Sequence, residues 1–190
     1  MNSIFNVYLL PLVAFALLGV IWRMRSAARA AQANAPGGPA VKGNVVPDTP
    51  ALALRDILMG GTLYLVLGPL AALATLALGA SISNLNADAF TRILVAGVQT
   101  AYLFGGMPAL CTGLLAGALR TSRWSWGRFG LTATAGMVGT MTLYLGNFHD
   151  RWPGDPIGPA FLLVGLPALL GTAIMTAVFY SRPWRMRRRG

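Results

Sequence analysis

Five long runs of the chain contain no Asp, Glu, Lys or Arg. They cover residues 1–22, 57–87, 93–119, 129–149 and 156–181. A helix rises about 1.5 Å per residue, so roughly 20 residues cross the apolar core of a bilayer, and each run is long enough to cross once. The pattern therefore predicts five transmembrane helices, near residues 3–22, 57–79, 94–118, 129–147 and 160–180.

The runs show neither the polar face of a soluble helix nor the alternation of a membrane β-strand. Residues 65–78 are apolar at nearly every position. A soluble amphipathic helix would place a polar residue every three or four positions, and a barrel strand would alternate apolar and polar residues. We therefore predict an all-α, polytopic helical membrane protein.

The basic residues predict how the chain is threaded. If each run crosses the membrane once, 13 of the 15 Lys and Arg residues lie on the same side of the membrane, and only Arg92 and Arg151 lie on the other side. The positive-inside rule then places the N-terminus outside and the C-terminus in the cytoplasm. The first basic cluster, Arg23-Met-Arg25, follows the first run, the reverse of the order in a cleavable signal, so we expect this run to remain as an anchor.

Four segments follow from this pattern. We expect an N-terminal transmembrane anchor (1–25), a flexible Ala/Gly/Pro-rich cytoplasmic linker (26–54), an antiparallel four-helix transmembrane bundle (55–181) and a basic cytoplasmic tail (182–190). Proline and glycine between residues 36 and 43 break helices, which supports the linker. The Ala-rich stretch from Arg25 to Gln32 is the alternative, an extension of the first helix beyond the membrane.

The net charge of +10 indicates a lipid partner more than a nucleic acid, because the basic residues are divided among short segments beside membrane ends. The densest group lies in the tail, and we expect it to contact anionic headgroups on the cytoplasmic side through Arg182, Arg185, Arg187, Arg188 and Arg189. Lys42 is the single lysine. This preference for arginine indicates a GC-rich bacterial genome, so the expected location is a bacterial inner (plasma) membrane.

Small residues recur at helical spacing in two of the predicted helices. Gly113 and Gly117 form a GxxxG motif, and Ala135 and Gly139 repeat the spacing. Such faces let two helix backbones approach closely in lipid. They predict packing inside the bundle, or a contact face for another membrane protein or a second copy of the chain.

Prolines interrupt three predicted spans, at Pro69, Pro108 and Pro167. Each predicts a kink. The segments starting at Gly106 and at Gly165 both read G-x-P-A-L, which leaves an internal duplication open. Broken helices in corresponding positions are typical of transporter sites, so Gln99, Pro108 and Pro167 are candidate pore or kink residues.

Groups that carry chemistry are scarce in the spans. Most polar residues there are threonines, whose hydroxyls can bond to their own helix three or four residues back. Outside the spans, the segment 147–155 holds His149, Asp150 and Asp155, which suits either a capped turn with Trp152 at the interface or a metal or acid-base site. A second histidine or thiolate to complete a metal shell is missing. We expect no catalytic, cofactor or metal site.

Two functions from different classes fit these features. The first is a non-catalytic membrane protein that acts through helix contacts, as an accessory or assembly subunit of a membrane complex or as an immunity-type protein. The second is a small oligomeric permease or channel for a neutral solute. A membrane enzyme built on His149, Asp150 and Asp155 is a third reading.

Overall fold

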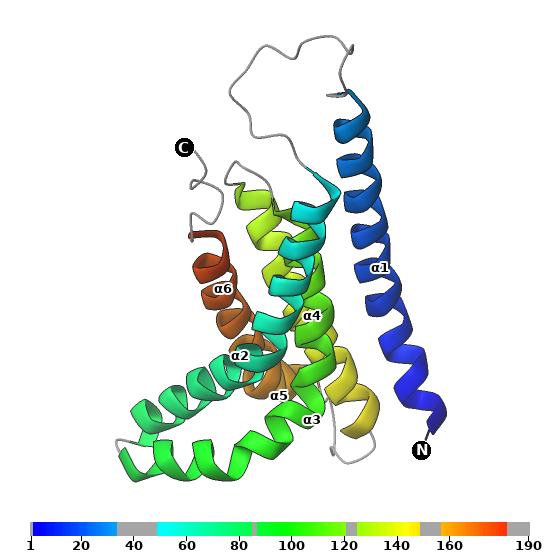
Figure 1. The fold of residues 1–190 in the computed structure, drawn as a ribbon. Helices are drawn as coiled ribbons and strands as arrows, with labels where there is room; N and C mark the ends of the chain where they lie inside the picture. Colours follow the sequence, from blue (N-terminus) through cyan, green and yellow to red (C-terminus); the bar gives the residue numbers. More distant parts are fainter. Residues whose placement is uncertain (1, 34–48, 85–86, 121–124, 149–156, 182–190) are drawn as a thin grey trace.

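The computed structural model describes residues 2–33, 49–84, 87–120, 125–148 and 157–181, and this part of the chain is helical almost throughout, with no strand. The all-α prediction is confirmed. Figure 1 shows the elements in order. They are α1 (Asn2–Ala33), α2 (Pro50–Asn84), α3 (Ala87–Leu119), α4 (Trp126–Phe148), and a composite last helix made of α5 (Ile157–Ala160), the π-helical η2 (Phe161–Gly165) and α6 (Leu166–Ser181).

Among the described residues, four helical segments are long and apolar enough to cross a membrane. They are Leu10–Gln32, Pro50–Ile82, Phe90–Leu119 and Ile157–Ser181. The chain is therefore a multi-pass membrane protein. The 23-residue α4 is helical where the sequence predicted another crossing, but it is not one of the four, because its threonines and glycines lower its mean hydropathy. Five crossings and the N-out, C-in orientation stay predictions.

The helices extend past the charge-free runs. α1 continues through the Ala-rich stretch to Ala33, as the alternative reading predicted, and α2 begins at Pro50 instead of near residue 57. Of the linker expected over 26–54, residues 34–48 lie outside the described residues. Charges ended the predicted spans, but they do not end a helix, because Arg is a good helix former and its long side chain reaches toward water from a helix end.

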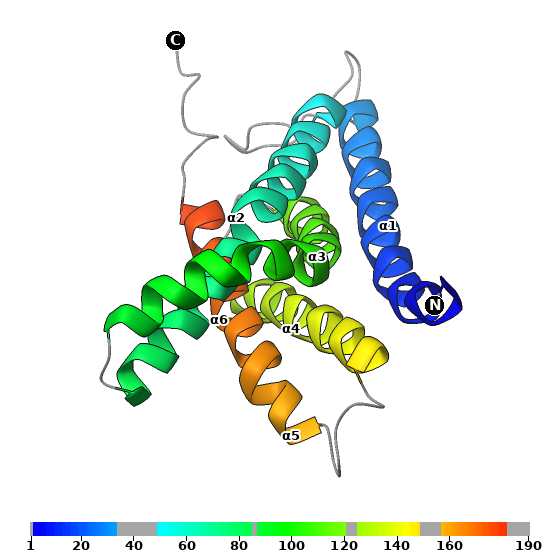
Figure 2. The same ribbon diagram turned by 90° about the horizontal axis from the view of Figure 1, so that it is seen from below.

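α2 and α3 pack with their backbones in contact. A Cβ atom placed on Gly117 of α3 would lie 2.5 Å from Cα of Ile57 in α2, and one placed on Gly113 would lie 2.7 Å from Cβ of Tyr64. Real Cβ atoms essentially never come this close. α1 lies outside this pair, beside α3 and α4 (Figures 1 and 2).

α2 and α3 each contain an internal proline, Pro69 and Pro108, and both helices change direction. The end of α2 and the start of α3 leave the bundle together and project sideways (Figures 1 and 2). We call these two arms, residues 70–84 and 87–104, the α2–α3 hairpin. Its arms are packed against each other, because a Cβ on Gly97 would lie 2.6 Å from Cδ1 of Leu73.

The last helix changes its winding just before Pro167. The backbone N–H of Leu166 donates to the carbonyl oxygen of Phe161, five residues back, which is the π-helical pattern. Pro167 has no N–H and cannot complete the ordinary ladder. The wider turn therefore coincides with the break that the sequence predicted here.

Candidate functional site

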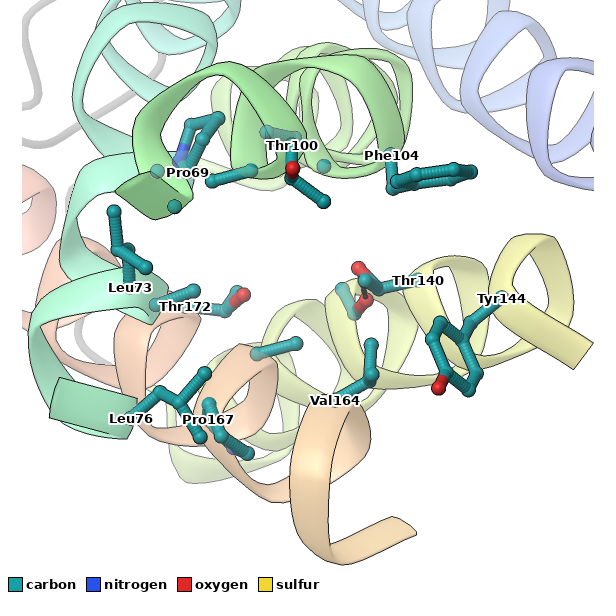
Figure 3. Close-up of a pocket in the computed structure, with 18 of the residues that line it drawn as sticks. Pro69, Leu73, Leu76, Thr100, Phe104, Thr140, Tyr144, Val164, Pro167 and Thr172 are labelled. Carbon is teal, nitrogen blue, oxygen red and sulfur yellow. Dashed lines mark hydrogen bonds between the residues drawn. The ribbon is translucent and has the colours of Figure 1, made fainter. Parts of the chain in front are cut away.

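A cavity of about 270 Å³ lies where α2, α3, α4 and the last helix cross (Figure 3). α2 and α3 form one wall with the base of the hairpin, and α4, η2 and α6 form the other. The lining residues are Tyr64, Gly68, Pro69, Ala72, Leu73, Leu76, Ile93, Gly97, Thr100, Ala101, Phe104, Gly105, Ala109, Gly136, Thr140, Tyr144, Leu163, Val164, Pro167, Ala168 and Thr172.

The broken helices create this space. Pro69 and Pro167 both line it, and Gly105 of α3 faces Pro69, with a Cβ placed there 3.6 Å from Cβ of the proline. Below the kink in α2, a Cβ on Gly171 of α6 would lie 2.7 Å from the backbone N of Ala72. The backbones of α2 and α6 are therefore in contact at Ala72. The helices separate next to the kink at Pro69, and this separation leaves the cavity.

A hydroxyl joins two of these elements. Thr75, in the hairpin, donates to the carbonyl oxygen of Ala72 at 2.7 Å and lies 3.2 Å from that of Pro167. On the other side of the Pro69 kink, the hydroxyl of Tyr64, which also lines the cavity, lies 2.5 Å from that of Thr176, and both are buried. The base of the hairpin is thus tied to the break in the last helix.

The cavity walls carry no charged side chain. Their surface is aliphatic and aromatic except for hydroxyls, of which Thr100, Thr140 and Thr172 border the open space from α3, α4 and α6 (Figure 3). The Thr140 hydroxyl donates to the carbonyl oxygen of Gly136 at 2.8 Å. Thr132, Thr142 and Thr176 make the same bond four residues back, so the predicted bonding of threonines to their own helices is confirmed for these residues.

The three candidate pore residues do not come together. Pro167 lines the cavity, whereas Pro108 is buried beside it, with its Cβ 3.4 Å from a Cβ placed on Gly139. Gln99 is exposed and does not line the cavity. Position around the axis of α3 explains why Gln99 is not in the cavity wall. Thr100 and Phe104 are one turn apart and face the cavity, whereas Gln99 lies on another side of the helix.

The predicted small-residue faces are occupied within the chain. Gly113 and Gly117 touch α2, as described above. Gly139 packs against α1, where a Cβ would lie 2.7 Å from Cδ2 of Leu12, and Ala135 is half-buried on α4. A partner protein would therefore have to dock on other surfaces than the Gly113 and Gly117 face.

Sequence reasoning missed a buried ion pair at the other end of the bundle. Nη1 of Arg120 lies 3.4 Å from Oδ1 of Asp56, and the two side chains are 5% and 4% exposed. The guanidinium also lies 4.6 Å from the ring centroid of Phe179. The predicted spans are the gaps between charged residues. Any charged residue, including Asp56 and Arg120, therefore falls at the end of a span. A signal was present, since Asp56 stands one turn before Gly60 and Arg120 one turn after Gly117, on the faces where the glycines meet.

The remaining candidates fall outside the described residues. These are His149, Asp150, Asp155 and the arginines of the tail, Arg182, Arg185, Arg187, Arg188 and Arg189. In the part of the chain that is described, no group of three or more His, Cys, Asp or Glu residues is placed to hold a metal ion.

Comparison of the chain with models of protein families, with curated proteins and with solved structures finds no match.

Proposed function

We propose that the chain is a non-catalytic integral membrane protein that holds a small neutral, mainly apolar molecule in its cavity and serves as an accessory subunit to another membrane protein. The observation that carries this proposal is the cavity between the broken helices, with walls that are apolar except for hydroxyls. A charged ligand would lose its hydration there and find no counter-charge, at a cost of several kcal/mol.

The cavity is half-open, and its volume indicates the size of the part of a molecule that it can enclose. A cavity of about 150 Å³ lined by apolar side chains is known to hold benzene, so one of about 270 Å³ suits a ligand of roughly ten non-hydrogen atoms. A molecule this apolar dissolves in the bilayer and crosses it unaided. Binding therefore serves to retain it or present it to a partner, which favours an accessory role over transport.

The α2–α3 hairpin is a surface that is open to a partner. It leaves the bundle (Figure 2) and exposes apolar side chains on both arms, among them Leu78, Ile82, Val95 and Val98. The exposed fraction of Val95 is 76%. Contact through such helices fits a protein that works by association within the membrane.

We place the protein in a bacterial inner membrane with its N-terminus outside. Support comes from the arrangement of the basic residues: the end of α1, the start of α2, the end of α3 and the start of α4 lie at the same end of the bundle (Figure 1). These ends carry Arg23, Arg25, Arg29, Arg55, Arg120 and Arg128. The positive-inside rule assigns that end to the cytoplasm.

A matched pair of substitutions tests the binding site. Val164 lines the cavity, whereas Val138 is 54% exposed on α4 and does not. Val164→Phe fills the space and should weaken binding of naphthalene to the full chain in lipid nanodiscs by about tenfold, equivalent to about 1.4 kcal/mol. Val138→Phe should leave binding unchanged. Empty nanodiscs correct for partition into lipid. Equal binding by the two variants, or none by the wild type, would reject the cavity as the site.

The partner is tested separately. Purification of the tagged chain from its native membrane in mild detergent should retain another membrane protein at fixed stoichiometry. A small permease for a neutral solute is the alternative, favoured by the break at Pro167 in the cavity wall. A homo-oligomer without a partner, together with solute flux in liposomes that Val164→Phe abolishes, would favour the permease.

A further inference from the structure

Two of the threonines that line the cavity lie at one corner, where α4 crosses α6. Thr140 and Thr172 both lie at Gly136: the Thr140 hydroxyl donates to its carbonyl oxygen at 2.8 Å, and a Cβ placed on Gly136 would lie 3.1 Å from Cβ of Thr172 and closer still to the Thr172 hydroxyl. Only a residue without a side chain leaves room for this hydroxyl. Figure 3 shows both threonines beside the open space.

We propose that this corner recognises a hydroxyl group, and that the molecule held in the cavity is a neutral alcohol or phenol. The inference rests on the proposed function, and it specifies the ligand of the same site. The Thr140 hydroxyl has a single hydrogen, which it already gives to Gly136, so it offers the ligand only lone pairs. The group that meets it must be a donor.

The rest of the wall fixes the remaining chemistry. No lining residue is charged, so a cationic donor such as an ammonium group would be buried without a counter-ion. The rings of Phe104 and Tyr144 and the aliphatic side chains, such as Leu73 and Val164, suit a hydrocarbon body. A neutral hydroxyl on an apolar body of roughly ten non-hydrogen atoms satisfies both parts of the cavity.

The experiment compares two probes of nearly the same shape, 2-naphthol and naphthalene, on the full chain in lipid nanodiscs. The ratio of 2-naphthol binding to naphthalene binding should be about three- to tenfold higher for the wild type than for empty nanodiscs. One neutral hydrogen bond accounts for a factor in this range. Thr140→Val and Thr172→Val keep the side-chain shape but remove the hydroxyl. Each should reduce the preference for naphthol toward one and leave the affinity for naphthalene within about twofold.

The chain offers a matched control on the same helix. Thr142 donates to the carbonyl oxygen of Val138 at 2.6 Å, in the same pattern as Thr140, but it does not line the cavity. Thr142→Val should keep the preference for naphthol, and Thr140→Ser, which retains a hydroxyl, should restore most of it. Because the same nanodiscs are used throughout, partition into lipid cancels when the ratio of the naphthol affinity to the naphthalene affinity is compared between variants.

The outcomes separate the two proposals. If naphthalene binds but naphthol is not preferred, or if the preference survives both Thr140→Val and Thr172→Val, the hydroxyl site is rejected while the apolar cavity stands. If neither probe binds above partition, the proposed function itself fails.

Discussion

The contact between α2 and α3 can be tested by adding a single methyl group. In Gly117→Ala, the new Cβ would lie 2.5 Å from Cα of Ile57 and 2.9 Å from the carbonyl carbon of Asp56. Ordinary van der Waals contact begins at 3.4 Å, so the helices must separate by about 0.9 Å here. The neighbours are backbone atoms and cannot rotate away.

The magnitude follows from two opposing effects. Overpacking of this kind costs about 1–3 kcal/mol, and the alanine returns up to about 1 kcal/mol through its higher helix propensity. The separation also strains the ion pair between Asp56 and Arg120, since Asp56 belongs to the peptide that is displaced. The first two effects leave a loss of about 0–2 kcal/mol, and the strained ion pair adds to it, so we expect Gly117→Ala to lower the free energy of unfolding by about 1–2 kcal/mol.

The assay is reversible unfolding in mixed micelles, followed by circular dichroism as the denaturing detergent is increased. Gly130→Ala on α4 and Gly79→Ala in the hairpin are the controls, because a Cβ at either position would have nothing within 4 Å. Both should be as stable as the wild type or slightly more stable. If Gly117→Ala matched these controls, α2 and α3 would not be in backbone contact, and the reasoning about the α2–α3 packing would be wrong.

Two further substitutions test other parts of the structure. Asp56→Asn leaves the Arg120 guanidinium buried without the Asp56 carboxylate, and it should lower the free energy of unfolding by about 3 kcal/mol in the same assay. Adding Arg120→Gln in a double variant should recover part of this loss, and additive losses would contradict a direct pair. Pro167→Ala supplies the missing N–H and lets the π turn relax to α-helix. The free energy of unfolding should stay unchanged or rise, while naphthalene binding weakens several-fold. Unchanged binding would show that the break does not shape the cavity.

The positions of the helices were predictable because the membrane imposes a simple rule: a charge inside a span is costly. Their ends were not. Asp56 lies inside the segment Pro50–Ile82, which is long and apolar enough to span the membrane, and its charge is tolerated there because it pairs with Arg120, the residue directly after α3. A pair formed by residues 64 positions apart depends on how two helices are rotated against each other. The sequence pattern does not contain that rotation.

The cavity could not be predicted either, because it too depends on how the helices are rotated against each other. The prolines predicted breaks, but Pro167 lines the cavity and Pro108 does not, although both occur in the same G-x-P-A-L context. Gln99 was the obvious polar candidate, and it lies on an exposed side of α3. For the threonines of the spans, which include Thr140 and Thr172, the sequence predicts only bonds to their own helices. Their proximity to Gly136 arises from the crossing of α4 and α6.

The length of α2 explains why the hairpin and the cavity occur together. Its 35 residues would extend roughly 50 Å as a straight helix, against about 30 Å of hydrocarbon. α2 must therefore tilt or bend, and Pro69 provides the bend. The bend moves the hairpin sideways and opens space beside the kink, where Thr75 ties the hairpin to the carbonyl oxygen of Pro167. A ligand in the cavity would contact the kink and the hairpin base at once, because Pro69, Ala72 and Leu73 all line it. The cavity and the surface proposed for a partner are therefore two consequences of the same bend in α2.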